Sequence, residues 1–284
     1  MDSPSLPIEE IRGELLDALQ APSPRILLKA PTGSGKSTGV PPMMDDAGLG
    51  ERGLIVVVQP RRMAARLLAR HVARLRGVEL GKEVGYVVRF ERHISPRTRI
   101  AYVTDGMLER WLTERPALEG VSAVVFDEFH ERSLSGDLSL GRILDLQEGP
   151  RPDMAVAVMS ATLEISGLRD YMGASCRVLE AHGRQYPVET VYRAPRLVSD
   201  GRGRVSPPPV WEQAADAVKE AVKDDGCGDV LVFMPGVYEI RKTAELLAGR
   251  PWMGGRDVFP LYGALTPEQQ NLSLIHISEP TRHS

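Results

Sequence analysis

Short apolar runs alternate with amphipathic stretches along the first two thirds of the chain. Short apolar runs bounded by turn residues are typical of buried strands, and apolar positions three and four residues apart are typical of helices. The expected strands are residues 26–29, 54–59, 100–104, 121–126 and 154–160. The expected helices are residues 8–20, 36–45, 61–76, 105–113, 134–147 and 164–172. This alternation predicts an α/β domain with a parallel sheet and helices on both faces.

A change of composition at residues 195–209, which are rich in proline, glycine and serine, predicts a linker. Beyond it the pattern resumes, with helices expected at 211–223 and 237–247 and strands at 229–234 and 258–261. Too few residues remain there for a sheet as large as the first. The predicted organisation is a first domain over residues 1–195, a linker over 196–210 and a partial second domain over 211–271.

Composition and length exclude several classes of protein. The 284 residues include only two cysteines, too few for a disulfide framework or a four-ligand zinc site, so a reducing cytoplasm is expected. The apolar runs, such as Leu54–Val58, are much shorter than a membrane span needs, and Met1–Pro7 lacks the basic start and apolar core of a signal peptide. A monomer without membrane contact is expected.

The net charge of −3 hides a basic stretch. From Arg61 to Arg99, ten arginines and one lysine face three glutamates, a local balance of +8 that leaves −11 for the rest of the chain. Such a stretch fits a binding surface for a polyanion, and it also fits a solvated helix face. Charge alone leaves both interpretations open.

A glycine-rich loop carries the first candidate chemistry. Residues 30–38 read APTGSGKST between an expected strand and an expected helix, which fits the Walker A pattern with Ala30 in place of its first glycine. Backbone N–H groups of Gly33, Ser34, Gly35 and Thr38 would surround phosphates. Lys36 would reach the β- and γ-phosphates of ATP, and the Ser37 hydroxyl would bind Mg²⁺.

An acidic pair follows the expected strand 121–126 and supplies the second half of such a site. Asp127 would hold Mg²⁺, and Glu128 would orient the water that attacks the γ-phosphate. Taken alone, the pair could also be a helix N-cap, as Ser160 and Thr162 could be after the strand 154–159. Next to this pair, His130 is interpreted as a polar coupler between the ATP site and a moving part.

With these residues in place, the sequence resembles the DEAH-box helicases of superfamily 2. Residues 127–133, DEFHERS, resemble motif II, with the phenylalanine that bacterial members of the HrpB type carry. The other motifs follow in family order. They are residues 59–66 (motif Ia), 103–108 (Ib), 160–162 (III), 231–236 (IV) and 261–265 just after it.

The resemblance implies a fold of two RecA-like domains, the second incomplete here, and an ATP-dependent helicase that acts on single-stranded RNA or DNA. It assigns Arg61, Arg62 and Thr104 to the sugar-phosphate backbone of the strand, in agreement with the basic stretch. It assigns Ser160 and Thr162 to the coupling of hydrolysis to domain movement. The position of the family's adenine-stacking arginine falls on His71, beside Arg70, which leaves the choice of nucleotide base open.

The end of the chain departs from the family abruptly. Residues 272–284 look like translated adapter DNA and are expected to be a non-native tail, with a genuine strand-and-turn ending as the alternative. Motifs V and VI are absent, so slow hydrolysis without unwinding is expected of this chain. A nucleotide- and strand-binding module without turnover is the alternative to a helicase. A P-loop kinase is disfavoured, because a kinase has no use for motifs Ia, Ib and III in this order.

Overall fold

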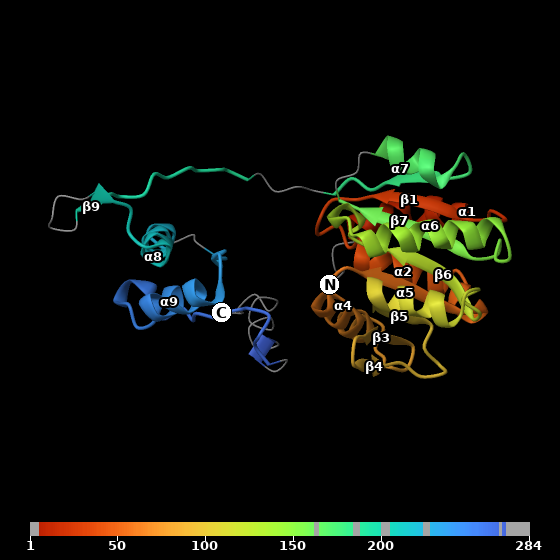
Figure 1. Ribbon diagram of the computed structural model, residues 1–284, viewed down its shortest axis with the longest axis horizontal. Helices are drawn as coiled ribbons and strands as arrows, with labels where there is room; N and C mark the ends of the chain where they lie inside the picture. The colour runs from red at the N-terminus through yellow and green to blue at the C-terminus, as the bar shows by residue number, and fades with distance from the viewer. Residues whose placement is uncertain are drawn as a thin grey trace. The chain divides into compact units, whose positions relative to one another are not determined.

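The computed structural model describes residues 6–161, 165–183, 188–199, 205–223, 228–266 and 269–270. The chain divides between Pro187 and Val188 into two compact units (Figure 1). Thr162 and the tail over residues 272–284 lie outside the described residues. The coupling role of Thr162 and the non-native character of the tail therefore stay predictions. Among the described helices, none combines the length and the apolar character needed to span a bilayer.

The first unit is built on an eight-stranded sheet. Its strands are β1 (Arg25–Lys29), β2 (Leu54–Gln59), β3 (Val84–Val88), β4 (Glu91–His93), β5 (Ile100–Thr104), β6 (Val121–Phe126), β7 (Ala155–Ser160) and β8 (Arg177–Glu180). They are arranged in the order β4-β3-β5-β2-β6-β7-β1-β8, and only β4 pairs antiparallel to its neighbour. The five predicted strands are confirmed. The edge strands β4 and β8 escaped prediction because they are partly exposed and lack an apolar run, and β3 because its apolar run lies inside the basic stretch.

Helices cover both faces of this sheet, as the pattern predicts. They are α1 (Arg12–Leu19), α2 (Lys36–Asp46), α3 (Leu49–Arg52), α4 (Arg62–Leu75), α5 (Asp105–Glu114), α6 (Leu134–Glu148) and α7 (Ile165–Met172), with 3₁₀ turns η1 (Pro7–Ile11) and η2 (Phe129–Glu131). Alternate residues of the central strands enter separate cores: Ile55 packs with the helices α1, α2 and α4, and Val56 with α5 and α6. The expected helix over 8–20 is divided into η1 and α1.

The register of the parallel strands places the two predicted halves of the phosphate site together. Gln59 of β2 pairs with Thr104 of β5, Val58 with Phe126 of β6, and Lys29 of β1 with Ser160 of β7. Gln59, Thr104, Phe126, Lys29 and Ser160 end their strands, and Val58 is next to last in β2, so the loops that follow these strands lie along one edge of the sheet. Ligands of open α/β sheets bind at this edge.

The second unit contains the helices α8 (Val210–Ala221) and α9 (Val237–Leu247), the turn η3 (Pro251–Met253) and a short ribbon of β9 (Val198–Ser199) with β10 (Val205–Ser206). Both expected helices are confirmed. The expected strands 229–234 and 258–261 are wrong, because the structure describes these residues as irregular. Phe233 is 87% exposed as a result.

Candidate nucleotide and strand sites

The loop between β1 and α2 forms the candidate phosphate cradle. Gly33 and Gly35 adopt φ of 79° and 88°, in the left-handed region that favours glycine. A Cβ on Gly35 would also lie 2.8 Å from Leu6 Cδ1. The loop is tied to the sheet where the Ala30 N–H donates to the Ser160 carbonyl at 3.0 Å. Lys36 begins α2, so the loop also holds the positive end of a helix dipole.

One polar atom in this loop is buried without a partner among the described residues. The Ser34 side chain is 1% exposed, and its hydroxyl makes no hydrogen bond. Buried hydroxyls are nearly always paired in proteins, so an orphan in a glycine-rich loop suits a site that a ligand completes. The Thr38 hydroxyl, by contrast, donates to the Gly35 carbonyl at 3.2 Å and so holds the first turn of α2.

Asp127 lies directly beyond β6 and is 4% exposed. Its backbone N–H donates to the Val58 carbonyl at 3.0 Å, which extends the pairing of β2 with β6 by one residue. Its carboxylate accepts from Gln59 Nε2 at 2.5 Å and from the Glu128 N–H at 2.9 Å. These bonds hold the carboxylate in place at the edge of the sheet.

Burial raises the pKa of Asp127, while hydrogen bonds from Ser37 and Gln59 lower it. The Ser37 hydroxyl and the Asp127 carboxylate are therefore in contact, as a magnesium site between Walker A and Walker B residues requires. Both are hard oxygen donors, the type that Mg²⁺ prefers. The residues present fit the ion.

Lys36 and Glu128 form a largely buried ion pair. Lys36 Nζ lies 2.9 Å from Glu128 Oε1, with side chains 4% and 26% exposed. Glu128 has φ of 50°, a left-handed conformation that is uncommon for a residue with a side chain. His130 Nδ1 lies 3.4 Å from Glu128 Oε2 but is buried without a hydrogen bond. Both oxygens of the predicted water-orienting carboxylate therefore face positively charged or ionisable groups.

Sequence reasoning assigned no role here to two residues, Gln59 and Tyr102. Gln59 donates a hydrogen bond to the Asp127 carboxylate. The feature of the sequence that could have revealed this role is a polar residue at the end of an apolar strand that neighbours β6. The buried Tyr102 hydroxyl donates to the Ser37 carbonyl at 2.8 Å. Burial and the charge of Asp127 raise the pKa of Tyr102, so it remains a donor. A tyrosine inside an apolar strand gives no signal for this role.

The predicted strand-binding residues lie along the same edge of the sheet. Arg61 and Arg62 are exposed where α4 begins, and Thr104 ends β5 just before α5. Arg61 forms two contacts with Glu131, from Nε to Oε2 at 3.2 Å and from the guanidinium to Oε1 at 3.0 Å. The Thr104 side chain makes no capping hydrogen bond to α5.

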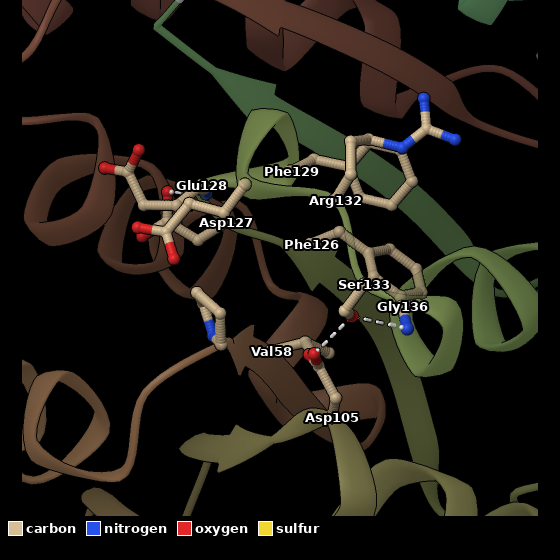
Figure 2. A pocket seen from close by; sticks show the side chains of 11 residues that line it. Val58, Asp105, Phe126, Asp127, Glu128, Phe129, Arg132, Ser133 and Gly136 are labelled. Atoms are coloured by element: carbon tan, nitrogen blue, oxygen red, sulfur yellow. Dashed lines mark hydrogen bonds between the residues drawn. The ribbon is translucent and has the colours of Figure 1, made fainter.

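A pocket of about 170 Å³ is lined by Asp127 and Glu128 of the phosphate site and by Pro60 and Asp105, the neighbours of Arg61 and Thr104 (Figure 2). Its lining comes from the ends of β2 and β6, the segment after β6 and the beginnings of α5 and α6. Figure 2 shows Ser133 pointing at Asp105, with Asp127 and Glu128 on the side away from this contact. The Ser133 hydroxyl donates to Asp105 Oδ2 at 2.7 Å and accepts from the Gly136 N–H at 2.9 Å.

The remaining predicted residues lie apart from this pocket. Ser160 is fully buried at the end of β7. His71 and Arg70 are exposed on α4, where Arg74 approaches His71 Nδ1 at 3.3 Å. Partial desolvation and the nearby Arg74 charge lower the pKa of His71. No contact in the described residues connects His71 with the phosphate cradle, so its part in base selection stays a prediction.

Comparison with known proteins gives consistent matches. A family model for DEAD/DEAH box helicases matches residues 10–171. The chain is 40% identical to the ATP-dependent RNA helicase HrpB of Escherichia coli strain K12 over 276 residues, which are 95% of this chain and 32% of that protein. It is 34% identical to the ATP-dependent RNA helicase HrpA of Borreliella burgdorferi over 270 residues, with the same two coverages.

Among solved structures, the crystal structure of Escherichia coli DEAH/RHA helicase HrpB matches with a TM-score of 0.79 and 40% identity. That match covers 94% of this chain and 32% of the other. The chain thus spans about a third of the length of these relatives. The family model covers more than half of the chain and most of the first unit, including both halves of the phosphate site. The chain belongs to the DEAD/DEAH box helicase family.

Proposed function

We propose that this chain binds ATP with Mg²⁺ and single-stranded RNA, and that the protein to which it belongs is an ATP-dependent RNA helicase. One observation carries the proposal. Lys36, Ser37, Asp127 and Glu128 converge at the sheet edge along which Arg61 and Thr104 also lie. The relatives named HrpB and HrpA, both called ATP-dependent RNA helicases, support the choice of RNA. DNA is the second candidate strand, since contacts to the phosphate backbone serve both.

The Lys36–Glu128 pair defines how the site would respond to nucleotide. The phosphates of ATP, which carry more negative charge than one carboxylate, would take Lys36 from Glu128 at the helix N-terminus. Glu128, released from the lysine, could then accept a proton of the attacking water and orient it toward the γ-phosphate. His130 would hold the other oxygen of that carboxylate.

The residues that fit Mg²⁺ are Ser37 and Asp127. Bound there with ATP, the ion would neutralise charge that develops on the phosphates. Gln59 keeps the Asp127 carboxylate in position, and Tyr102 does the same for the backbone of Ser37. The rate of the chemical step would therefore depend on these two neighbours as well as on the ligands themselves.

The proposed RNA-binding residues contact the sugar-phosphate backbone and not the bases. Arg61, Arg62 and Thr104 offer charge and a hydroxyl, which suit phosphate oxygens and carry no sequence information. Binding should therefore weaken with salt, by a slope of roughly −0.7 in log affinity per log salt for each phosphate neutralised.

An ATP hydrolysis assay with and without single-stranded oligouridine tests the proposal. We expect binding of a fluorescent ATP analogue that requires Mg²⁺, and turnover that rises when the RNA is added. Binding of both ligands without turnover would support the alternative, a nucleotide- and strand-binding module. Failure to bind nucleotide would contradict both.

A further inference from the structure

The segment that follows Glu128 is bonded to one predicted strand-binding residue, Arg61, and to Asp105, the neighbour of another, Thr104. Glu131 forms an ion pair with Arg61. Ser133 is uncharged, and its hydroxyl donates a hydrogen bond to Asp105, the residue after Thr104. Glu131 and Ser133 lie three and five residues beyond Glu128, across the single 3₁₀ turn η2. Two independent contacts thus join one short segment to two different strand ends.

We infer that Glu131 and Ser133 are positioning residues, through which an RNA strand on Arg61 and Thr104 changes the setting of Glu128. The inference rests on the proposed function and adds to it the residues that connect its two sites. Neither residue touches the reacting atoms. Each acts through a partner, Glu131 through Arg61 and Ser133 through Asp105.

The Arg61–Glu131 contact is suited to exchange. The arginine side chain is 72% exposed and the glutamate 32%, and ion pairs this exposed contribute about 0–1 kcal/mol. A phosphate that binds Arg61 can therefore compete with Glu131. Release of Glu131 would free the end of η2, which lies directly after the left-handed Glu128.

The Ser133–Asp105 contact is suited to rigid transmission. The single Ser133 hydroxyl bonds Asp105 and at the same time caps α6 through the Gly136 N–H (Figure 2). Asp105 is the first residue of α5. An RNA strand that moves Thr104 and α5 when it binds therefore also moves the beginning of α6. Movement at this point is passed to the segment between Glu128 and Ser133.

A linkage measurement on the chain tests this inference. The affinity for fluorescein-labelled oligouridine is measured with and without a non-hydrolysable ATP analogue and Mg²⁺, and the ratio is the coupling factor. By thermodynamic reciprocity, RNA must change the affinity for the analogue by the same factor. Factors of about 5 to 150 are typical of coupled sites.

We expect Ser133→Ala and Asp105→Ala each to lower the coupling factor about fivefold, while the affinity for each ligand alone changes less than about twofold. The double variant should lose no more than either single one, because both remove the same bond. Ser133→Thr, which keeps the hydroxyl, should restore coupling. Ser133→Asp caps α6 but repels Asp105, and so it separates the link from the cap.

Three results would overturn the inference. They are a wild-type coupling factor of one, an unchanged factor in both alanine variants, or restored coupling in Ser133→Asp. Each leaves the proposed function standing as long as both ligands bind. Absence of binding by the wild-type chain would instead contradict the proposed function, and with it the inference.

Discussion

The segment from Asp127 to Ser133 carries one ion pair near its beginning and one near its end, and the two pairs differ in how exposed their partners are. At one end Glu128 pairs with Lys36, a lysine that is 4% exposed and lies in the phosphate loop. At the other end Glu131 pairs with an arginine that is 72% exposed. Loss of one partner of a buried pair leaves a charge without compensation, whereas an exposed pair is replaced by water and salt. The nucleotide end should therefore respond to single charges, and the strand end to ionic strength.

Lys36→Ala breaks the buried pair and should have the largest effect. We expect affinity for the ATP analogue to fall by at least about 100-fold, because truncation of a buried charged partner typically costs 2–5 kcal/mol or more. Equilibrium titration with a fluorescent analogue measures this. The matched control is Lys29→Ala at the end of β1, just before the phosphate loop, which removes an exposed lysine 3.6 Å from Glu180 and should stay within about twofold of wild type. Equal losses in both variants would contradict the role of Lys36.

Glu128→Gln removes the charge at the same end and keeps the shape. ATP hydrolysis should fall by about 100-fold or more, the scale of a lost general base. Affinity for the analogue should be retained or raised, because the carboxylate no longer competes for Lys36. Steady-state turnover and analogue titration on the same protein separate the two effects. Hydrolysis at the wild-type rate would remove Glu128 as the residue that orients water.

Arg61→Ala with Arg62→Ala tests the strand end. If each arginine neutralises one phosphate, the slope of log affinity against log salt should become shallower by about 1.4. Fluorescence anisotropy with oligouridine at several salt concentrations gives the slope. Arg52→Ala with Arg115→Ala changes net charge equally at the C-terminal ends of α3 and α5, on the opposite edge of the sheet, and should leave the slope unchanged. An equal change in both pairs would mean that only net charge matters.

Glu131→Gln should have the smallest effect of these variants, and its effect is measured on stability. Its exposed pair contributes little, so the free energy of unfolding should change by no more than about 0.5 kcal/mol. Chemical denaturation measures the change. A loss of several kcal/mol would show that this end of the segment is held as firmly as the Lys36 end, and the contrast between the two would disappear.

Much of the phosphate site could be predicted from the sequence because its chemistry is local. Lys36 and Ser37 follow one strand and Asp127 follows another, and parallel strands bring such positions to one edge. The bonds between Gln59 and Asp127, and between Ser133 and Asp105, depend on strand register and helix placement. Apolar periodicity does not specify either, so these contacts emerged only with the structure.

The two units show a second limit of such prediction. The segments 121–126 and 229–234 both carry short apolar runs, but only the first becomes a strand. It is flanked by β2 and β7, which accept and donate its backbone hydrogen bonds. The second has no described neighbour to pair with, and Leu231 is 70% exposed. An apolar run predicts the tendency to form a strand, and the available partners determine whether it does.

The most direct test of the account is a crystal structure of the chain with an ATP analogue and Mg²⁺. The account predicts that Lys36 Nζ contacts a phosphate oxygen and no longer lies within ion-pair distance of Glu128, compared with 2.9 Å here. A structure in which the phosphates bind while the Lys36–Glu128 pair stays intact would contradict it.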